Sequence, residues 1–381
     1  MKIPQPDGTF TEHTPGTPRA WARPATPPSA RIAYAAAHVV ADRFGENTPG
    51  APAAVDWEST LAFRRHLCSY GLGVAEAMDT AQRGMGLDWA ATRELIRRSA
   101  AEARACGGRI AAGAGTDHAP EASTVDEVVH AYLEQVAVVE DAGARVILMA
   151  SRQLAAVAAG PGDYHAVYGR VLGQVSAPVI LHWLGPMFDP ALEGYWGSAG
   201  LDAATESFVA LVTEHAAKVD GVKVSLLDAA HEVRLRRALP AGVRLYTGDD
   251  FNYPALIRGD EEGHSDALLG VFAAIAPAAS AALQALDAGD LAGYREVLEP
   301  TVPLARHLFA APTYYYKTGI AFLAWLSGHQ PGFTMVGGLA SGRSVVHLAQ
   351  AYRMADALGL LPDPELAADR MRAFLTVAGV A

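Results

Sequence analysis

Short apolar runs alternate with longer amphipathic stretches through residues 31–272 of the chain. The runs have the length of buried strands, and the stretches between them repeat their hydrophobic positions with a helical period. Strands are predicted at residues 32–40, 72–78, 108–114, 144–149, 178–183, 219–226, 242–246 and 267–272. Helices are predicted between them at residues 88–105, 124–142, 203–219 and 229–239. This alternation is typical of βα units around a parallel sheet.

Eight such units in roughly 250 residues match the size of a (β/α)8 TIM barrel, an α/β fold whose reactive groups lie at the carboxyl ends of the strands. An open, doubly wound sheet would also alternate strands and helices. It normally carries a phosphate-binding glycine fingerprint after its first strand, and the sequence has none there. A barrel over residues 31–272 is therefore the predicted fold.

The two ends of the chain differ from this central part. Residues 1–30 contain seven prolines and no apolar core of signal-peptide length, so they are expected to form a proline-rich arm. Residues 273–381 are expected to form a C-terminal helical extension, with helices at residues 278–287, 290–309, 313–326, 344–358 and 364–377. Lys317 and the three tyrosines before it open one of these helices, where packing is the expected role.

The composition excludes several classes of partner. The 381 residues carry a formal net charge of −11 and no run of lysine or arginine, whereas nucleic acids and anionic membrane surfaces require a basic footprint. No apolar stretch reaches the ~18 residues that a membrane helix needs. The two cysteines, Cys68 and Cys106, cannot form a thiolate cluster by themselves, and a reducing cytoplasm is the expected location.

Lys223 is one of only four lysines and interrupts the apolar run of residues 219–226. Strand alternation directs Val222 and Val224 to one side of the sheet and Lys223 to the other, which in a barrel is the interior. Burial favours the neutral amine, and a neutral amine can attack a carbonyl group to form a Schiff base. The alternative is a lysine that reaches solvent or pairs with a nearby aspartate.

The strands on either side of Lys223 also end in polar or aromatic groups. His182 and Trp183 close the preceding strand, and Asp249 and Asp250 follow the next one. An imidazole can relay protons, and the indole offers a face on which a sugar ring can stack. Asp249 and Asp250 are candidates for orienting the amine or binding substrate, or one of them, expected to be Asp250, caps the following helix. His264, before the eighth strand, is a candidate for the rim of the pocket.

The order of these motifs resembles the superfamily of dihydrodipicolinate synthase and N-acetylneuraminate lyase, which are Schiff-base class I aldolases. The resemblance covers roughly residues 30–325. It rests on residues 55–57 (Val-Asp-Trp), 87–92 (Leu-Asp-Trp-Ala-Ala-Thr), 110–115 (Ile-Ala-Ala-Gly-Ala-Gly), 221–225 (Gly-Val-Lys-Val-Ser), 247–250 (Thr-Gly-Asp-Asp), 276–277 (Ala-Pro) and 286–291 (Leu-Asp-Ala-Gly-Asp-Leu).

The resemblance implies that Lys223 is the Schiff-base lysine of an aldolase, lyase or dehydratase that needs no cofactor or metal. The family's carboxylate-binding loop is similar here only to residues 79–82, which makes Thr80 a catalytic candidate and Asp79 and Gln82 substrate-binding candidates. The family's proton-relaying tyrosine corresponds to His182. A carbonyl substrate and assembly into a homodimer or homotetramer are further implications. The reduced match to the carboxylate-binding loop and the presence of Trp183 favour a polyhydroxylated substrate derived from a sugar.

Two other functions remain open from the sequence. A metal-dependent sugar isomerase or aldolase could use the histidines near different strand ends, which are His118, His182, His231 and His264. No His-x-His pair follows the first strand, which makes a metal site the weaker interpretation. A non-catalytic sugar-binding barrel is the third possibility, but it would have no use for an interior lysine.

Overall fold

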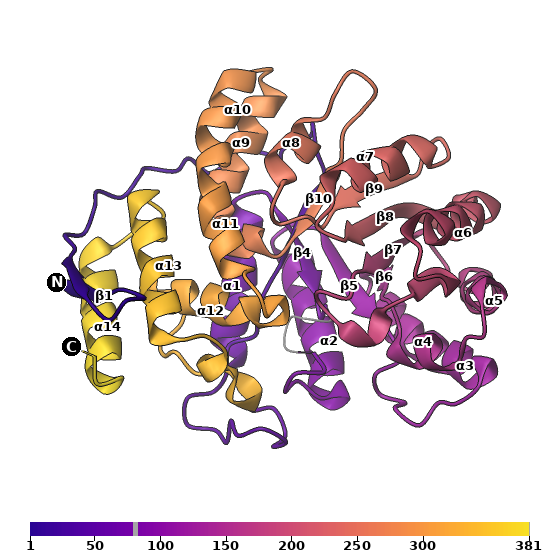
Figure 1. Cartoon of the computed structure of the whole chain (residues 1–381), viewed down its shortest axis with the longest axis horizontal. Helices are drawn as coiled ribbons and strands as arrows, with labels where there is room; N and C mark the ends of the chain where they lie inside the picture. Colours follow the sequence, from indigo (N-terminus) through magenta and orange to yellow (C-terminus); the bar gives the residue numbers. More distant parts are fainter. Residues whose placement is uncertain (79–82, 381) are drawn as a thin grey trace.

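Eight parallel strands close into a barrel in the computed structural model, which describes residues 1–78 and 83–380 (Figure 1). The strands are β3 (Ala33–Ala36), β4 (Gly73–Glu76), β5 (Ile110–Ala114), β6 (Arg145–Leu148), β7 (Val179–Leu184), β8 (Val219–Ser225), β9 (Arg244–Thr247) and β10 (Asp266–Leu269). They pair in chain order, and β10 returns to β3. Each overlaps one of the eight predicted runs, so the predicted (β/α)8 TIM barrel is confirmed.

Helices cover the outside of the barrel. They are α1 (Trp57–Ser69), α2 (Trp89–Ala105), α3 (Val125–Asp141), α4 (Arg152–Val157), α5 (Pro161–Leu172), α6 (Leu201–Glu214), α7 (Ala229–Ala238) and α8 (Tyr253–Arg258). Local sequence explains several of their starts. Thr124 accepts the N–H of Glu127 at 3.2 Å, and the Glu127 carboxylate accepts the N–H of Thr124 at 3.1 Å. This reciprocal capping box fixes the beginning of α3.

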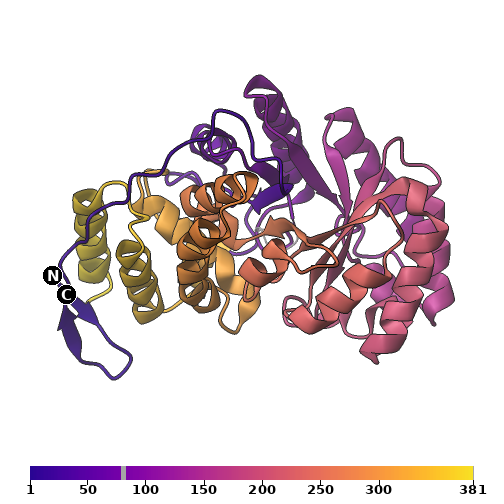
Figure 2. The ribbon, with the colours of Figure 1, turned by 90° about the horizontal axis from the view of Figure 1, so that it is seen from above.

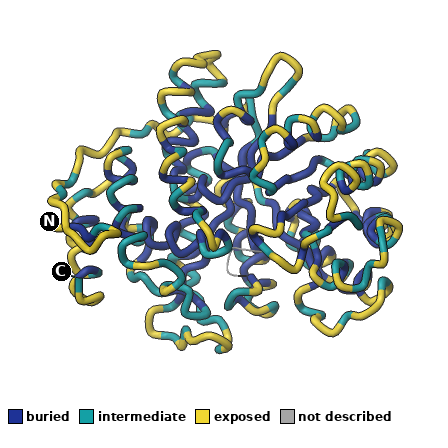
Figure 3. The backbone as a smooth tube through the Cα atoms, viewed as in Figure 1, coloured by how far each residue is buried: buried dark blue, intermediate teal, exposed yellow. Residues whose placement is uncertain are grey.

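The side chains of each strand alternate between two apolar clusters. One cluster fills the barrel interior and includes Tyr34, Ile180 and Tyr246. The other lies between the strands and the helices and includes Val222 and Val224. The centre of the barrel is accordingly buried on both sides of the sheet (Figure 3). Strand alternation therefore directs Lys223 to the interior, as the sequence predicts.

The C-terminal helices continue from the barrel as a separate stack on one side of it (Figures 1 and 2). They are α9 (Ala276–Asp287), α10 (Leu291–Leu298), α11 (Val302–Leu308), α12 (Tyr316–Leu326), α13 (Val345–Ala357) and α14 (Pro364–Val377). The proline-rich arm begins with an antiparallel hairpin of β1 (Lys2–Pro4) and β2 (Phe10–Glu12), and β1 contacts α13. The arm then runs along this stack back to the barrel.

Among residues 1–78 and 83–380, no helix combines the length and the apolar character that crossing a bilayer requires.

Candidate active site

Lys223 lies in the middle of the barrel, on β8, with 8% of its surface exposed. In the parallel register it stands beside His182 of β7 on one side and Tyr246 of β9 on the other. A Cβ atom at Gly248, which follows β9, would lie 3.0 Å from the Lys223 Cε atom. Glycine at this position therefore leaves the room that the lysine side chain occupies at the carboxyl end of β9.

His182 is fully buried, and its Nε2 atom lies 3.2 Å from the hydroxyl of Ser225. Ser225 is two residues after Lys223, so both side chains leave β8 on the interior face. A Cβ atom at Gly248 would collide with the Ser225 hydroxyl at 2.2 Å. The imidazole, the hydroxyl and the amine therefore all lie in the barrel interior, where a glycine closes the β9 side.

The two aspartates after β9 have different surroundings. Asp249 holds the turn before α8, because its carboxylate accepts the N–H groups of Phe251 at 2.8 Å and Asn252 at 3.0 Å. Asp250 instead accepts the N–H of Val271 beyond β10, at 2.8 Å, and interacts electrostatically with Lys223. The structure brings Asp250 into the group around Lys223. The prediction that Asp250 caps the following helix is wrong, because the N-cap residue of α8 is Asn252, which has no side-chain capping hydrogen bond.

Burial raises the pKa of Asp250 to about 7. The hydrogen bond from Val271 and the charge of Lys223 oppose this rise, and Asp249 adds to it. A carboxyl group with such a pKa can hold or release a proton near neutral pH, which is the property required of a general acid or base.

A second lysine reaches the same end of the barrel from outside the βα units. Lys317, in the first turn of α12, is buried and donates a hydrogen bond to the carbonyl oxygen of Ala36, the last residue of β3. Burial lowers its pKa to about 7; the charge of Asp250 opposes this shift, and those of Arg64 and Lys223 add to it. The prediction that the residues at the start of this helix serve only in packing is therefore wrong for Lys317.

On the β5 and β6 side of the same end, polar groups line a cavity of about 290 Å³. The Thr116 hydroxyl lies 2.6 Å from that of Ser151 and 2.7 Å from the Gln153 side-chain oxygen. Arg83 closes the cavity toward β4, and its guanidinium pairs with Asp117, after β5, at 2.7 Å. Hydroxyl and amide groups in such a cavity can bind the hydroxyl groups of a polar substrate.

Comparison with known proteins assigns the chain to a family. A family model described as "Protein of unknown function (DUF993)" matches residues 1–380. The chain belongs to this DUF993 family. The match includes the arm, the barrel and the C-terminal helices, so all three parts are features of the family. No curated protein matches the sequence.

Solved structures of the dihydrodipicolinate synthase family have a similar fold. A putative dihydrodipicolinate synthetase from Pseudomonas aeruginosa is 17% identical with a TM-score of 0.64, over 87% of this chain and 100% of that one. YagE from E. coli K12, a prophage protein of the family in complex with pyruvate, is 14% identical with a TM-score of 0.67, over 87% and 99%. At these identities the likeness shows a common fold, as the sequence resemblance implies.

Trp183 is not part of the interior group of the DUF993 chain. It lies between the barrel and its helices, with its ring edge-to-face to Phe208 at 5.3 Å, to His231 at 5.5 Å and to Trp196 at 6.2 Å. The prediction of a sugar-stacking surface is wrong because alternation places neighbouring residues on opposite sides of a strand. With His182 inside, Trp183 must point outward.

His264 lies at the opposite end of the barrel from the mouth. It precedes Asp266, the first residue of β10, and its charged neighbours include Arg31 and Arg244, which also lie at the amino ends of strands. The prediction that it lines the pocket rim is wrong, because a loop that enters a parallel strand lies at the amino end of that strand. Reactive groups in this fold lie at the other end.

Three candidates, Asp79, Thr80 and Gln82, lie outside the described residues. Among residues 1–78 and 83–380, no group of three or more histidine, cysteine, aspartate or glutamate side chains could hold a metal ion.

Lys317 is the functional candidate that the strand pattern misses. One signal for it was present in the sequence: it is one of four lysines, and it lies in a helix that is otherwise almost entirely apolar. A helix that is hydrophobic all round is buried, so a charged residue within it needs a partner inside the protein.

Proposed function

We propose that this DUF993 chain is an aldolase or lyase that forms a Schiff base between Lys223 and a carbonyl substrate. The proposal rests on the position of Lys223. Its amine lies inside a (β/α)8 barrel, on a residue that pairs with His182 of the neighbouring strand, and it interacts electrostatically with Asp250. An interior amine beside groups that can exchange protons is what imine formation requires.

The first step joins enzyme and substrate. The neutral Nζ atom of Lys223 attacks the carbonyl carbon, and the carbonyl oxygen takes up a proton to give a carbinolamine. Loss of a proton from nitrogen and departure of the hydroxyl group as water then leave a protonated imine. This cation accepts the electron pair released when a neighbouring carbon–carbon bond breaks, or when a carbon–hydrogen bond breaks before water is eliminated.

His182 and Asp250 are proposed to carry the protons of these steps. His182 is linked to the Ser225 hydroxyl at 3.2 Å, which gives the imidazole a route toward the amine two residues earlier on β8. Asp250, with its pKa raised to about 7, can give a proton to the leaving hydroxyl and take one back. Lys317 is proposed as a positioning residue whose charge sets the protonation of Asp250.

The substrate is proposed to be a polyhydroxylated carbonyl compound derived from a sugar. Support comes from the cavity at the ends of β5 and β6, where Thr116, Ser151 and Gln153 offer hydrogen-bonding groups. Thr80 remains a proposed catalytic residue, with Asp79 and Gln82 proposed at the same substrate, on the sequence resemblance alone. A homodimer or homotetramer in the cytoplasm also remains part of the proposal.

The test is reduction of the imine in the intact protein. The chain is incubated with pyruvate, 2-keto-3-deoxy sugar acids, keto sugars and aldoses in turn, then treated with borohydride, and its intact mass is measured. A fitting compound should add its own mass, minus water and plus two hydrogen atoms. The mass should not change without the compound, and prior treatment with EDTA should leave the adduct unaffected.

The matched control is Lys223→Arg, because a guanidinium stays protonated and does not act as a nucleophile. The proposal requires this variant to fold and to form no adduct. Equal adduct in Lys223→Arg and wild type, or no adduct with any compound that binds, would refute it. Turnover that EDTA abolishes would instead favour a metal-dependent enzyme.

A further inference from the structure

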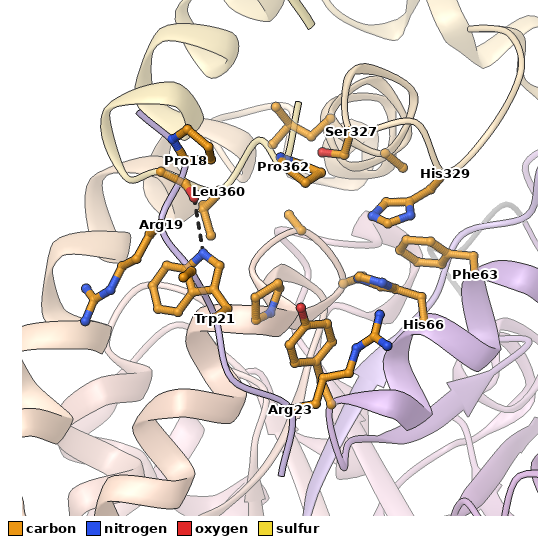
Figure 4. Close-up of a pocket in the computed structure, with 18 residues that line it drawn as sticks. Pro18, Arg19, Trp21, Arg23, Phe63, His66, Ser327, His329, Leu360 and Pro362 are labelled. Carbon is orange, nitrogen blue, oxygen red and sulfur yellow. Dashed lines mark hydrogen bonds between the residues drawn. The ribbon is translucent and has the colours of Figure 1, made fainter. Parts of the chain in front are cut away.

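A cavity of about 450 Å³ lies away from the barrel mouth, between helix α1, the C-terminal helices and the N-terminal arm (Figure 4). Phe63, His66 and Tyr70 of α1 form one wall. His329, just after α12, lies beside His66 and Phe63 on the same side. Leu360, after α13, lies across the cavity from them, and Trp21 of the arm closes the outer side. Lys223 is not among the residues that line it.

The arm that covers this cavity is held at both ends by specific contacts. On one side Asp356 of α13 accepts the N–H of Gly16 at 2.9 Å, and the carbonyl of Gly359 accepts the Trp21 indole N–H at 3.1 Å. On the other side the Asp287 carboxylate, at the end of α9, accepts the N–H of Ser29 at 2.9 Å. The outer wall of the cavity is therefore a built feature of the fold.

A glycine permits the close approach of the arm. Gly359 has a φ of +64°, in the region that favours glycine, and a Cβ atom there would lie 2.8 Å from the backbone nitrogen of Arg19. The same carbonyl of Gly359 that holds Trp21 also accepts the N–H of Arg19, at 3.0 Å.

The lining combines aromatic rings with positive charge. Trp21, Phe63 and Tyr70 offer flat apolar surfaces, and Arg19 and Arg23 lie over two of these rings, 4.5 Å from the Trp21 centroid and 5.6 Å from that of Tyr70. The lining contains no aspartate or glutamate. Within the described residues neither guanidinium forms an ion pair, although the chain as a whole carries a net charge of −11.

Two imidazoles add hydrogen-bonding groups inside the cavity. The rings of His66 and His329 lie 4.0 Å apart, centroid to centroid. Burial lowers the pKa of His66 to about 3 and that of His329 to about 4, so both are neutral at pH 7 and each carries one N–H donor. In the described part of the chain, neither ring forms a hydrogen bond with another protein group.

We propose that this cavity binds a flat aromatic molecule that carries a carboxylate, at a site separate from Lys223. The rings match the aromatic body, and the volume lies in the range of small-molecule sites. The Arg23 guanidinium, which lies on the His66 side of the cavity, and the imidazole N–H donors match the carboxylate, because charge-assisted hydrogen bonds to arginine are among the strongest that a carboxylate accepts. The inference does not depend on the proposed imine chemistry.

Calorimetric titration of the full-length protein tests this with benzoate and indole-3-acetate as the probes. Benzyl alcohol and indole-3-ethanol are the matched molecules without the carboxylate, and acetate is the match without the ring. Both aromatic acids should bind at least about tenfold more tightly than their alcohols and than acetate, the factor that about 1.4 kcal/mol of charge-assisted bonding gives.

Variants of the cavity and matched controls locate the binding. Arg23→Gln should weaken the acids about tenfold, because this exposed side chain supplies the charge, and Trp21→Leu should weaken them through the lost ring. The matched control, Arg97→Gln with Arg170→Gln on α2 and α5, should leave the affinity unchanged, as should Lys223→Arg.

Three results would overturn the inference. The first is that neither acid binds more tightly than its alcohol. The second is equal affinity in the Arg23→Gln variant and the wild type. The third is loss of binding in Lys223→Arg, which would mean that the acids enter the barrel instead.

Discussion

Lys317 and Asp250 interact electrostatically inside the protein, although one belongs to a C-terminal helix and the other to the loop after β9. Both are buried, and Asp250 also interacts with Lys223. The pKa of Asp250 is raised and that of Lys317 is lowered, and burial is the main cause of both shifts because it penalises the charged forms of the carboxyl group and the amine. The C-terminal helices therefore contribute a titratable group to the centre of the barrel as well as packing against it.

Substitution of Lys317 by methionine should change how stability depends on pH. The pKa of Lys317 is about 7 in the folded protein and 10.5 in the unfolded chain. Between pH 7 and pH 10.5, Lys317 is therefore protonated in the unfolded chain but not in the folded protein. Through this group the free energy of unfolding rises with pH across that window, by up to about 1.4 kcal/mol per pH unit. Lys317→Met should lose this rise.

Denaturant unfolding at pH 6 to 10 measures the effect in both proteins. The wild type should gain stability relative to Lys317→Met as the pH rises above 7. Parallel curves for the two proteins would show that Lys317 keeps an ordinary pKa in the folded state. Turnover should also fall in Lys317→Met, because Asp250 loses a cationic neighbour.

Two substitutions of His182 distinguish a role in proton transfer from a role in packing. His182→Ala should lower turnover at least ~100-fold, the low end of general acid–base contributions. His182→Tyr, which restores a group able to donate and accept a proton, should keep much of the activity with a shifted pH profile. Steady-state kinetics over pH 5 to 9 make the comparison, and unchanged turnover in His182→Ala would end the proposed role.

Trp183 should matter for stability and not for substrate affinity. Its ring is 3% exposed and packs against Phe208 and Trp196 outside the barrel. Trp183→Ala should lower the free energy of unfolding by about 3–5 kcal/mol, the usual cost of removing a large buried ring. Trp183→Phe should cost less, and its KM should equal that of the wild type. A raised KM in a stably folded Trp183→Phe variant would return the ring to the substrate site.

The barrel could be predicted from the sequence because each strand is a short apolar run between helical stretches, and a period of two is enough to orient Lys223. The same period of two puts Trp183 on the opposite face of the strand from His182. The two side chains therefore cannot both belong to the interior site. To predict the position of His264, the direction of the chain is needed as well. The loop before a strand and the loop after it lie at opposite ends of a barrel. Lys317 could not be placed from periodicity, because α12 is buried all round and only tertiary structure sets its neighbours.

Lys223, and not Lys317, is the proposed nucleophile. Both are buried near Asp250, but Lys317 is held by the carbonyl of Ala36 and Lys223 is the more exposed of the two. Peptide mapping by mass after borohydride reduction distinguishes all four lysines of the chain. We expect a secondary amine on Lys223 with the compounds that fit, and none on Lys317. An adduct on Lys317 with Lys223 unmodified would contradict it.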